Sequence, residues 1–403
     1  MSKVISTEME RLLATGSTLR AMFEEGKIMR QKYGADKVYD FSLGNPNVPA
    51  PEEFNASLKK VIDTTDSLKL HGYMSNAGYE ESRQAIADNL NKRFGTNFGI
   101  PNITMTVGAA NAFVIAMKIL LNPGDEVVVF APFFLEYRNY IADFGGVTKV
   151  VPPNPPTFMP DMEQFAAAIN EKTRAVIINN PNNPSGVIYD EETIKQIAKV
   201  MSDAEEKYGR PIFLISDEPY REIVYDGVEV PFLTKYYKNT LVCYSFSKSL
   251  SLPGERVGYL CIPDEADESE RIIAASSIGI RVLGCVNAPS LQQLAIIDCL
   301  DITTDIEAYA KNRKALMDAM DQAGFEYAKP DGTFYMFVKT PMEDDKEFVT
   351  LAKEKYQILC SSGAAFDCPG YVRFAYCVSH DMIVRATPNI IALGKELGMT
   401  KLE

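Results

Sequence analysis

The sequence predicts an α/β fold in which a mostly parallel sheet lies between helices. Three short apolar runs lead to this prediction, and each is followed at once by polar residues: Ala175–Ile178, Ile212–Ile215 and Leu241–Tyr244. From Asn183 to Asp217 is 34 residues, and from Asp217 to Lys248 is 31. That interval suits one strand, a crossover helix and the return to the next strand. With 403 residues, the chain is also long enough for a second, smaller domain.

The polar segments after the three runs hold the candidate functional residues. The first is 179–186 (NNPNNPSG), the second is 216–220 (SDEPY), and the third, 245–258, holds Lys248. In an open α/β sheet, ligands bind outside the carboxyl ends of the strands. We therefore expect Asn183, Asp217, Tyr220 and Lys248 to converge.

The residue types in the third segment suit an aldehyde cofactor that carries a phosphate. Lys248 has Ser245, Ser247 and Ser249 beside it, and Arg256 follows eight positions on. In enzymes that use pyridoxal 5′-phosphate (PLP), a lysine amine forms a Schiff base with the aldehyde, and a guanidinium suits the phosphate. Taken alone, this segment is equally compatible with a solvated turn.

The two upstream segments supply what the ring of such a cofactor needs. A carboxylate raises the pKa of a nearby ring nitrogen by favouring the cation, and Asp217 is the candidate. Tyr220 and Asn183 carry a hydroxyl and an amide that can donate to the ring's 3-oxygen. Each segment alone could be an ordinary turn or strand exit. Together, in this order and at these intervals, the three segments indicate a PLP site.

Further motifs give the chain a resemblance to a known family. It resembles the fold-type I PLP enzymes of the class I/II aminotransferases, the aspartate aminotransferase group, nearly from end to end. Segment 40–47 (DFSLGNPN) resembles the loop where a glycine backbone touches the substrate, which implicates Gly44. Segment 72–79 (GYMSNAGY) resembles the one whose tyrosine reaches the phosphate in the neighbouring subunit, which implicates Tyr73.

Segment 106–110 (TVGAA) resembles the family's phosphate loop, and this implicates Gly108, Ala109 and Ala110. A helical stripe of apolar residues follows from Ala112 to Leu120. The physical interpretation agrees, because small residues at a helix N-terminus let backbone N–H groups approach an anion. An ordinary helix start remains the alternative.

The resemblance also assigns roles to residues in and around the third segment. Ser245, Lys248 and Arg256 correspond to the phosphate serine, the Schiff-base lysine and the phosphate arginine. Phe134 corresponds to the aromatic residue stacked on the pyridine ring, although paired phenylalanines such as Phe133 and Phe134 are also typical of a core.

Two arginines correspond to substrate-binding positions of the family. Arg373, in the apolar strand pattern 371–375 (YVRFA), matches the arginine that grips the substrate α-carboxylate. A bidentate guanidinium suits a planar carboxylate, and a buried arginine needs such a partner. Arg281 lies near the position of a second arginine, from the other subunit, that binds a side-chain carboxylate. Its spacing to the segment 287–289 (NAP) differs by one residue from the family pattern, so an exposed helix arginine remains the alternative.

The activity that the resemblance implies is transamination by a ping-pong mechanism in a homodimer, with aspartate or glutamate as the preferred amino donor. Two alternatives stay open, which are a carbon–sulfur β-lyase of the same fold and an aminotransferase for aromatic or aliphatic amino acids. A PLP-sensing regulator is disfavoured, because the segment before Phe41 is too short for a DNA-binding domain with its linker. A non-catalytic dimer is disfavoured because every candidate site residue is present.

By the same resemblance, a large PLP-binding domain spans 51–295, and a small α+β domain combines 1–50, which includes an N-terminal arm, with 296–403. Within these we expect a helix start at Gly16-Ser17-Thr18, a loop at Pro152–Pro156, a helix ending near Ala323 and a strand over 332–338.

Composition excludes several other classes. The net charge of −13 argues against a nucleic-acid partner. No run of about 18 apolar residues occurs, and the N-terminal residues are mixed and acidic, so we expect neither a membrane span nor a signal peptide. The seven cysteines form no C-x-x-C pair and there are only two histidines, which disfavours zinc and suits free thiols in the cytoplasm.

Overall fold

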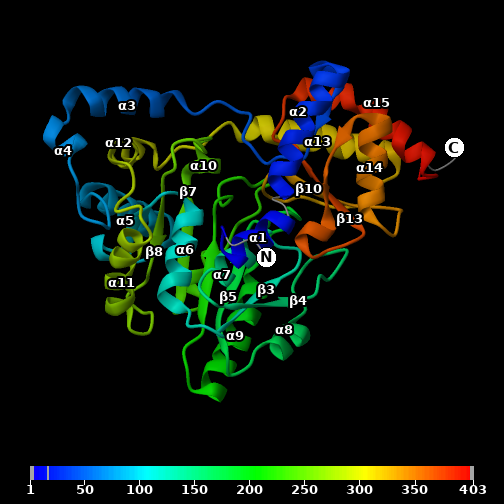
Figure 1. Ribbon diagram of the computed structural model, residues 1–403. Coiled ribbons are helices and arrows are strands. Elements are labelled where there is room, and N and C mark those ends of the chain that lie inside the picture. The colour runs from blue at the N-terminus through cyan, green and yellow to red at the C-terminus, as the bar shows by residue number, and fades with distance from the viewer. Residues whose placement is uncertain (1–3, 16–17, 400–403) are drawn as a thin grey trace. The chain divides into compact units, whose positions relative to one another are not determined.

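The computed structural model describes residues 4–15 and 18–399 (Figure 1). The chain divides into two compact units. The larger unit consists of Pro46–Glu307 and Lys329–Thr333, and the smaller unit takes the chain up to Asn45, Ala308–Ala328 and everything from Phe334 onward.

A seven-stranded sheet forms the centre of the larger unit, in the order β2-β8-β7-β6-β5-β3-β4. Strand β8 runs antiparallel to both its neighbours, and all other neighbouring strands are parallel. The predicted apolar runs lie in β5, β6 and β7, so the predicted α/β class is confirmed. The strands are β2 (Ile103–Thr106), β3 (Glu126–Phe130), β4 (Val147–Val151), β5 (Thr173–Asn179), β6 (Phe213–Asp217), β7 (Thr240–Ser245) and β8 (Gly258–Cys261).

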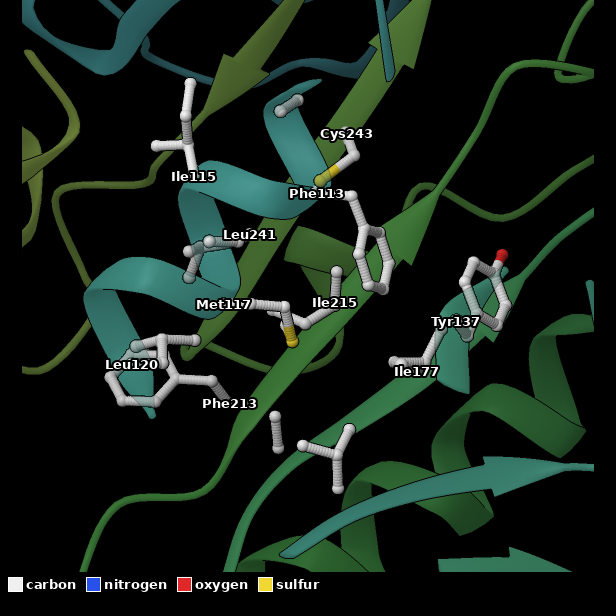
Figure 2. Packing of buried hydrophobic residues seen from close by; sticks show 14 of the residues in the cluster. Phe113, Ile115, Met117, Leu120, Tyr137, Ile177, Phe213, Ile215, Leu241 and Cys243 are labelled. Atoms are coloured by element: carbon white, nitrogen blue, oxygen red, sulfur yellow. The ribbon is translucent and has the colours of Figure 1, made fainter. Parts of the chain in front are cut away.

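Helices cover both faces of this sheet. Side chains alternate between the two faces along each strand, so each face presents apolar side chains that the helices bury. On one face, Ile177, Ile215 and Leu241 pack with residues of α6, α7 and α11 in one apolar cluster (Figure 2). On the other face, Val242 and Tyr244 pack with residues of α3, α5 and α12. Each fully buried side chain of this size contributes about 1.5–3 kcal/mol by leaving water.

The helices of the larger unit include the helix expected after the phosphate-loop motif, which is α6. They are α3 (Glu52–Thr64), α4 (Ser67–His71), α5 (Glu80–Phe94), α6 (Ala109–Leu120), α7 (Tyr137–Ala142), α8 (Met162–Ala168), α9 (Glu191–Tyr208), α10 (Phe246–Ser249), α11 (Ser269–Val282), α12 (Ser290–Ala295) and the 3₁₀ turns η2 (Ile100–Asn102), η3 (Leu233–Lys235) and η4 (Ile296–Cys299).

The smaller unit contains a four-stranded antiparallel sheet in the order β12-β13-β10-β9, and a parallel pair of β1 with β11. The strands are β1 (Tyr39–Asp40), β9 (Tyr327–Ala328), β10 (Tyr335–Lys339), β11 (Ile358–Leu359), β12 (Ser361–Ser362) and β13 (Tyr371–Ala375). The helices are α1 (Thr7–Thr15), α2 (Thr18–Tyr33), α13 (Ile306–Ala323), α14 (Asp345–Tyr356), α15 (His380–Glu396) and the turns η1 (Ala35–Lys37) and η5 (Gly363–Phe366).

Three local predictions can be compared with these elements. The helix expected to end near Ala323 is α13, which ends there. The strand expected over 332–338 begins only at Tyr335, because Thr333 has a φ of 64° and is left-handed. Helix α2 begins at Thr18, and the rest of the expected cap, Gly16 and Ser17, lies outside the described residues.

Among residues 4–15 and 18–399, no helix has the length and apolar character needed to cross a bilayer. Within the same ranges, no group of histidine, cysteine, aspartate and glutamate side chains is arranged to hold a metal ion.

Candidate active site

The three polar segments begin at one edge of the large sheet. Strands β5, β6 and β7 are parallel neighbours, and Asn179 is the register partner of Asp217, which in turn pairs with Cys243. The carboxyl ends of the three strands therefore lie side by side, which is where an open α/β sheet binds its ligands.

Asp217 is a buried carboxyl group held only by hydrogen bonds. It is 8% exposed, and its Oδ2 accepts from the Tyr137 hydroxyl at 2.5 Å and from Asn179 Nδ2 at 3.4 Å. In the part of the chain that the structure describes, it has no ion pair with a lysine, arginine or histidine. Burial raises its pKa to about 7, against the hydrogen bond from Tyr137, which lowers it. Such a carboxyl group is suited to a cation supplied by a ligand.

Side-chain hydrogen bonds hold the loop after β5. Asn179 Oδ1 accepts from the Asn183 backbone N–H at 2.6 Å, and Asn179 Nδ2 donates to the Asp217 carbonyl at 3.0 Å. Asn182 Oδ1 accepts from both the backbone N–H and the hydroxyl of Ser185, at 3.1 and 2.7 Å. Asn183 and Tyr220 are both buried. The loop is thereby tied to β6 at Asp217, which fixes the backbone of Asn183 relative to that carboxyl group.

Lys248 lies half-buried in the short helix α10, directly after β7. Ser245 caps this helix, because its Oγ accepts from the Ser247 N–H at 3.2 Å, and it also bonds Ser247 Oγ at 2.8 Å. Arg256 Nη1 donates to Ser247 Oγ at 3.4 Å, and its Nη2 donates to the Val107 carbonyl at 3.1 Å. The arginine is thus linked to both the segment that holds Lys248 and the loop before α6.

The N-terminus of α6 completes a cradle with these residues. Gly108 precedes the helix with a φ of 82°, which favours glycine. A Cβ atom at this position would lie 2.7 Å from Arg256 Nη2 and 3.4 Å from Ser245 Oγ. The first backbone N–H groups of α6, those of Ala109 and Ala110, precede the hydrogen-bonded turns of the helix and carry the positive end of its dipole. Backbone donors, hydroxyls and a guanidinium therefore meet at one point, an arrangement suited to a phosphate dianion.

Chemically, this donor set fits pyridoxal phosphate. The cradle is suited to its phosphate, the Asp217 carboxyl group to its protonated ring nitrogen, and the Lys248 amine to its aldehyde. The fit depends on two observations of this structure, which are a buried carboxyl group without a cation of its own and a glycine whose Cβ would collide with the cradle.

Arg373 and Gly44 lie together in the smaller unit. Arg373, in the centre of β13, is 3% exposed, and its Nη2 donates to the Ser42 carbonyl at 2.8 Å. Its guanidinium carbon lies 4.5 Å from the centroid of the Tyr335 ring and 4.8 Å from that of Phe366. A Cβ at Gly44 would collide with the Tyr335 hydroxyl group. Tyr335 therefore contacts two of the residues that the sequence linked to the substrate, Gly44 and Arg373.

The two phenylalanines of the 132–134 segment differ in their surroundings. Phe133 is buried in the core, whereas Phe134 is partly exposed at the edge of the same cluster. The Phe134 ring meets Tyr137 edge-on, at 5.7 Å and 83°. Of the pair, Phe134 is the one left accessible to a ligand.

Tyr73 and Arg281 do not join the other site residues within one chain. Tyr73 is 91% exposed, and Arg281 is exposed in the last turn of α11. Neither side chain has a hydrogen bond or an ion pair within the described ranges. A single chain thus leaves both of them facing solvent.

Sequence reasoning missed Tyr137 and Asn179 in the larger unit and Tyr335 in the smaller unit. Tyr137 and Asn179 contact Asp217, and Tyr335 contacts Arg373. No signal in the sequence identified Tyr137, because its contact with Asp217 depends on how α7 packs on the sheet.

Comparison with known proteins identifies the family of this chain. The family model described as aminotransferase class I and II matches residues 36–390. The aspartate aminotransferase of Thermotoga maritima is 29% identical over 365 residues, covering 89% of this chain and 92% of the relative. The probable aspartate/prephenate aminotransferase of Thermus aquaticus is 27% identical over 373 residues, covering 89% and 91%. A solved structure of an amino transferase from Eubacterium rectale has a TM-score of 0.95 at 45% identity, covering 98% of this chain and 99% of that one.

Proposed function

The chain belongs to the class I and II aminotransferases, which depend on pyridoxal phosphate, and from that premise we propose that it moves the amino group of aspartate or glutamate to a 2-oxo acid. The observation that carries the site assignment is Asp217, a buried carboxyl group without a protein cation among the described residues, at the carboxyl edge of the sheet. The names of the relatives support the choice of amino donor.

Lys248 is the proposed acid–base residue. When bound, pyridoxal phosphate supplies the electron sink that makes the substrate Cα–H acidic. The Lys248 amine would hold the cofactor aldehyde until an amino acid takes its place, and the freed amine would then remove the substrate Cα proton as a base and return it as an acid. Because the product leaves before the second substrate binds, we expect ping-pong kinetics.

The other residues of the sheet edge hold the ring and the phosphate in this proposal. Asp217 would keep a proton on the ring nitrogen, and Tyr220 and Asn183 would donate to the ring oxygen. Phe134 would contact the ring face. The cradle described above would hold the phosphate, through Gly108, Ala109, Ala110, Ser245, Ser247 and Arg256.

Arg373 is the proposed partner of the substrate α-carboxylate, and Gly44 contacts the substrate through its backbone. A planar guanidinium can hold a carboxylate by two parallel hydrogen bonds, which fixes the direction of the Cα–H bond. Arg281 of a second copy would bind the side-chain carboxylate, and this accounts for the preference for aspartate and glutamate.

A homodimer follows from the roles of Tyr73 and Arg281. We infer that Tyr73 reaches the phosphate bound to the neighbouring copy, since it extends from one chain with almost its whole surface exposed. Leu68, five residues earlier, is similarly exposed, and large apolar side chains grouped in this way suit a covered interface. The seven free thiols are consistent with a reducing compartment such as the cytoplasm.

Absorbance spectroscopy of the purified, PLP-loaded protein tests the proposal. Aspartate or glutamate should convert the visible band of the lysine-bound cofactor into the near-ultraviolet band of its amino form, and a 2-oxo acid should reverse this. Lys248→Ala is the control and should not turn over. Conversion only by aromatic or aliphatic amino acids would remove Arg281 from the site. Release of pyruvate from cystathionine without conversion would identify a β-lyase.

A further inference from the structure

Tyr137 is a buried tyrosine whose ring cannot move freely. It is 2% exposed and lies at the start of α7. Its ring stacks on Phe113 at 4.9 Å and 12°, and on Phe133 at 6.4 Å and 11°, while Phe134 meets it edge-on. Figure 2 shows the ring at the margin of the apolar cluster, with its oxygen pointing away from the labelled apolar side chains. The packing therefore fixes where the hydroxyl group lies.

That hydroxyl group is a permanent donor to Asp217. It bonds Oδ2 at 2.5 Å, a distance typical of a hydroxyl donating to a carboxylate. Burial, followed by the nearby Asp217 charge, raises the pKa of Tyr137 well above its usual value, so the hydroxyl keeps its proton at any working pH. The second donor to Oδ2, Asn179 Nδ2, is more distant at 3.4 Å.

The other oxygen of the carboxyl group is in a different position. No described residue donates a hydrogen bond to Asp217 Oδ1. A carboxylate fixed through one oxygen presents the other in a defined direction, which a protonated ring nitrogen requires.

We propose that Tyr137 is a positioning residue of the aminotransferase reaction, which holds Asp217 by Oδ2 and leaves Oδ1 for the protonated ring nitrogen of the cofactor. This inference rests on the proposed role of Asp217. Hydrogen bonding from Tyr137 makes the carboxylate a weaker base, so that the shared proton stays on the ring nitrogen. Without the hydroxyl, the proton would shift toward Asp217, and the ring would become a poorer electron sink.

The matched test compares two tyrosine-to-phenylalanine variants of the PLP-loaded enzyme. Tyr137→Phe keeps the stacked ring and removes only the hydroxyl group. Tyr237→Phe is the control, because Tyr237 is similarly buried and its hydroxyl donates to the Ile212 carbonyl at 2.7 Å, at the opposite end of β6. Both variants lose a buried hydrogen bond from a tyrosine hydroxyl, but only one of these bonds ends on Asp217.

We expect kcat of Tyr137→Phe to fall about 10- to 100-fold, the loss that corresponds to one hydrogen bond to a charged group, while KM stays within about twofold. The ¹⁵N signal of ring-labelled cofactor should move toward the unprotonated value. Tyr237→Phe should change neither kcat nor the ¹⁵N signal. An unchanged kcat in Tyr137→Phe, or a lower kcat with the ¹⁵N signal unmoved, would overturn the inference.

Two further variants distinguish a failure of the role proposed for Asp217 from a failure of the role proposed for Tyr137. If Asp217→Asn retains full activity, the proposed function of Asp217 fails; if it is inactive while Tyr137→Phe is normal, only the present inference fails. Should Tyr137→Phe not fold, a fluorotyrosine at position 137 preserves the packing and donates more strongly. Its stronger hydrogen bond should lower the pKa of Asp217 in the cofactor-free protein, and an unchanged pKa would contradict the proposal.

Discussion

Asp217 and Glu218 are consecutive residues at the end of β6, and both are buried, but their surroundings differ. Glu218 is 1% exposed, and its Oε2 accepts from Arg221 Nε at 2.5 Å while its Oε1 accepts from the Ser216 hydroxyl at 2.6 Å. Among the described residues, the Asp217 carboxyl group accepts from Tyr137 and Asn179, and it has no such cation.

The difference separates a structural carboxylate from one suited to a ligand. Removing an ion from water costs several kcal/mol unless a counter-ion and hydrogen bonds compensate for it. Arg221 compensates Glu218 within the protein, so this ion pair is complete without any ligand. Burial raises the pKa of Asp217 to about 7, and no lysine, arginine or histidine of the described chain pairs with it to offset this. A protonated ring nitrogen would provide that charge.

The largest expected effect comes from removing the unpaired carboxyl group. Asp217→Ala should lower kcat by about a thousandfold or more, the scale expected when a preorganised charge at the reacting group is lost. Steady-state kinetics with saturating PLP would measure this. The matched change at the neighbouring residue, Glu218→Gln, should leave kcat within about tenfold of the unmodified enzyme's value, provided that the variant folds. The comparison fails if the two variants lose activity equally.

The second effect concerns the stability of the cofactor-free protein. The folded pKa of Asp217 is raised from 3.8 to about 7, so the folded state binds the proton more tightly than the unfolded state does. The resulting stabilisation is complete below about pH 4 and is lost as the pH rises through about 7, a change of about 4 kcal/mol. Asp217→Asn should lack this dependence and should be the more stable protein at about pH 8. Urea unfolding of both proteins at about pH 5 and about pH 8 measures how much the free energy of unfolding changes with pH. An equal change in the unmodified protein and in Asp217→Asn would contradict this prediction.

The third and smallest effect concerns the ion pair between Glu218 and Arg221, which we regard as structural. Glu218→Gln leaves the buried Arg221 guanidinium without its counter-ion, which should lower the free energy of unfolding by about 3 kcal/mol. Denaturant unfolding of the PLP-loaded protein would measure this loss. A loss below about 0.5 kcal/mol would mean that the pair contributes little to folding.

Much of this arrangement could be predicted from the sequence. The apolar runs of β5, β6 and β7 end in polar residues, and parallel strands bring such ends to one edge, so the sequence alone could assign Asp217 and Lys248 to a common region. The ion pair between Glu218 and Arg221 was also within reach, because residues three apart near a turn can face each other.

Tyr137 could not be found in this way. Nothing in the sequence near Tyr137 marks its hydroxyl as directed at a strand 80 residues later. The contact depends on how α7 packs on the sheet, which is a property of the tertiary structure. Similarly, the strand that should have begun at Gly332 starts later because of the backbone conformation of Thr333, a residue whose type gives no warning of a positive φ.

The roles proposed for the sheet edge all depend on Asp217 being a buried carboxyl group whose cation comes from the cofactor. The most direct test is to follow the Asp217 carboxyl group by ¹³C NMR or difference infrared spectroscopy, with Asp217→Asn to assign its signal, in the cofactor-free and PLP-loaded proteins. We predict that the group titrates with a pKa of about 7 without the cofactor, and that the cofactor keeps it ionised down to below about pH 5. A pKa of about 4 in the cofactor-free protein, or a pKa that loading leaves unchanged, would contradict this.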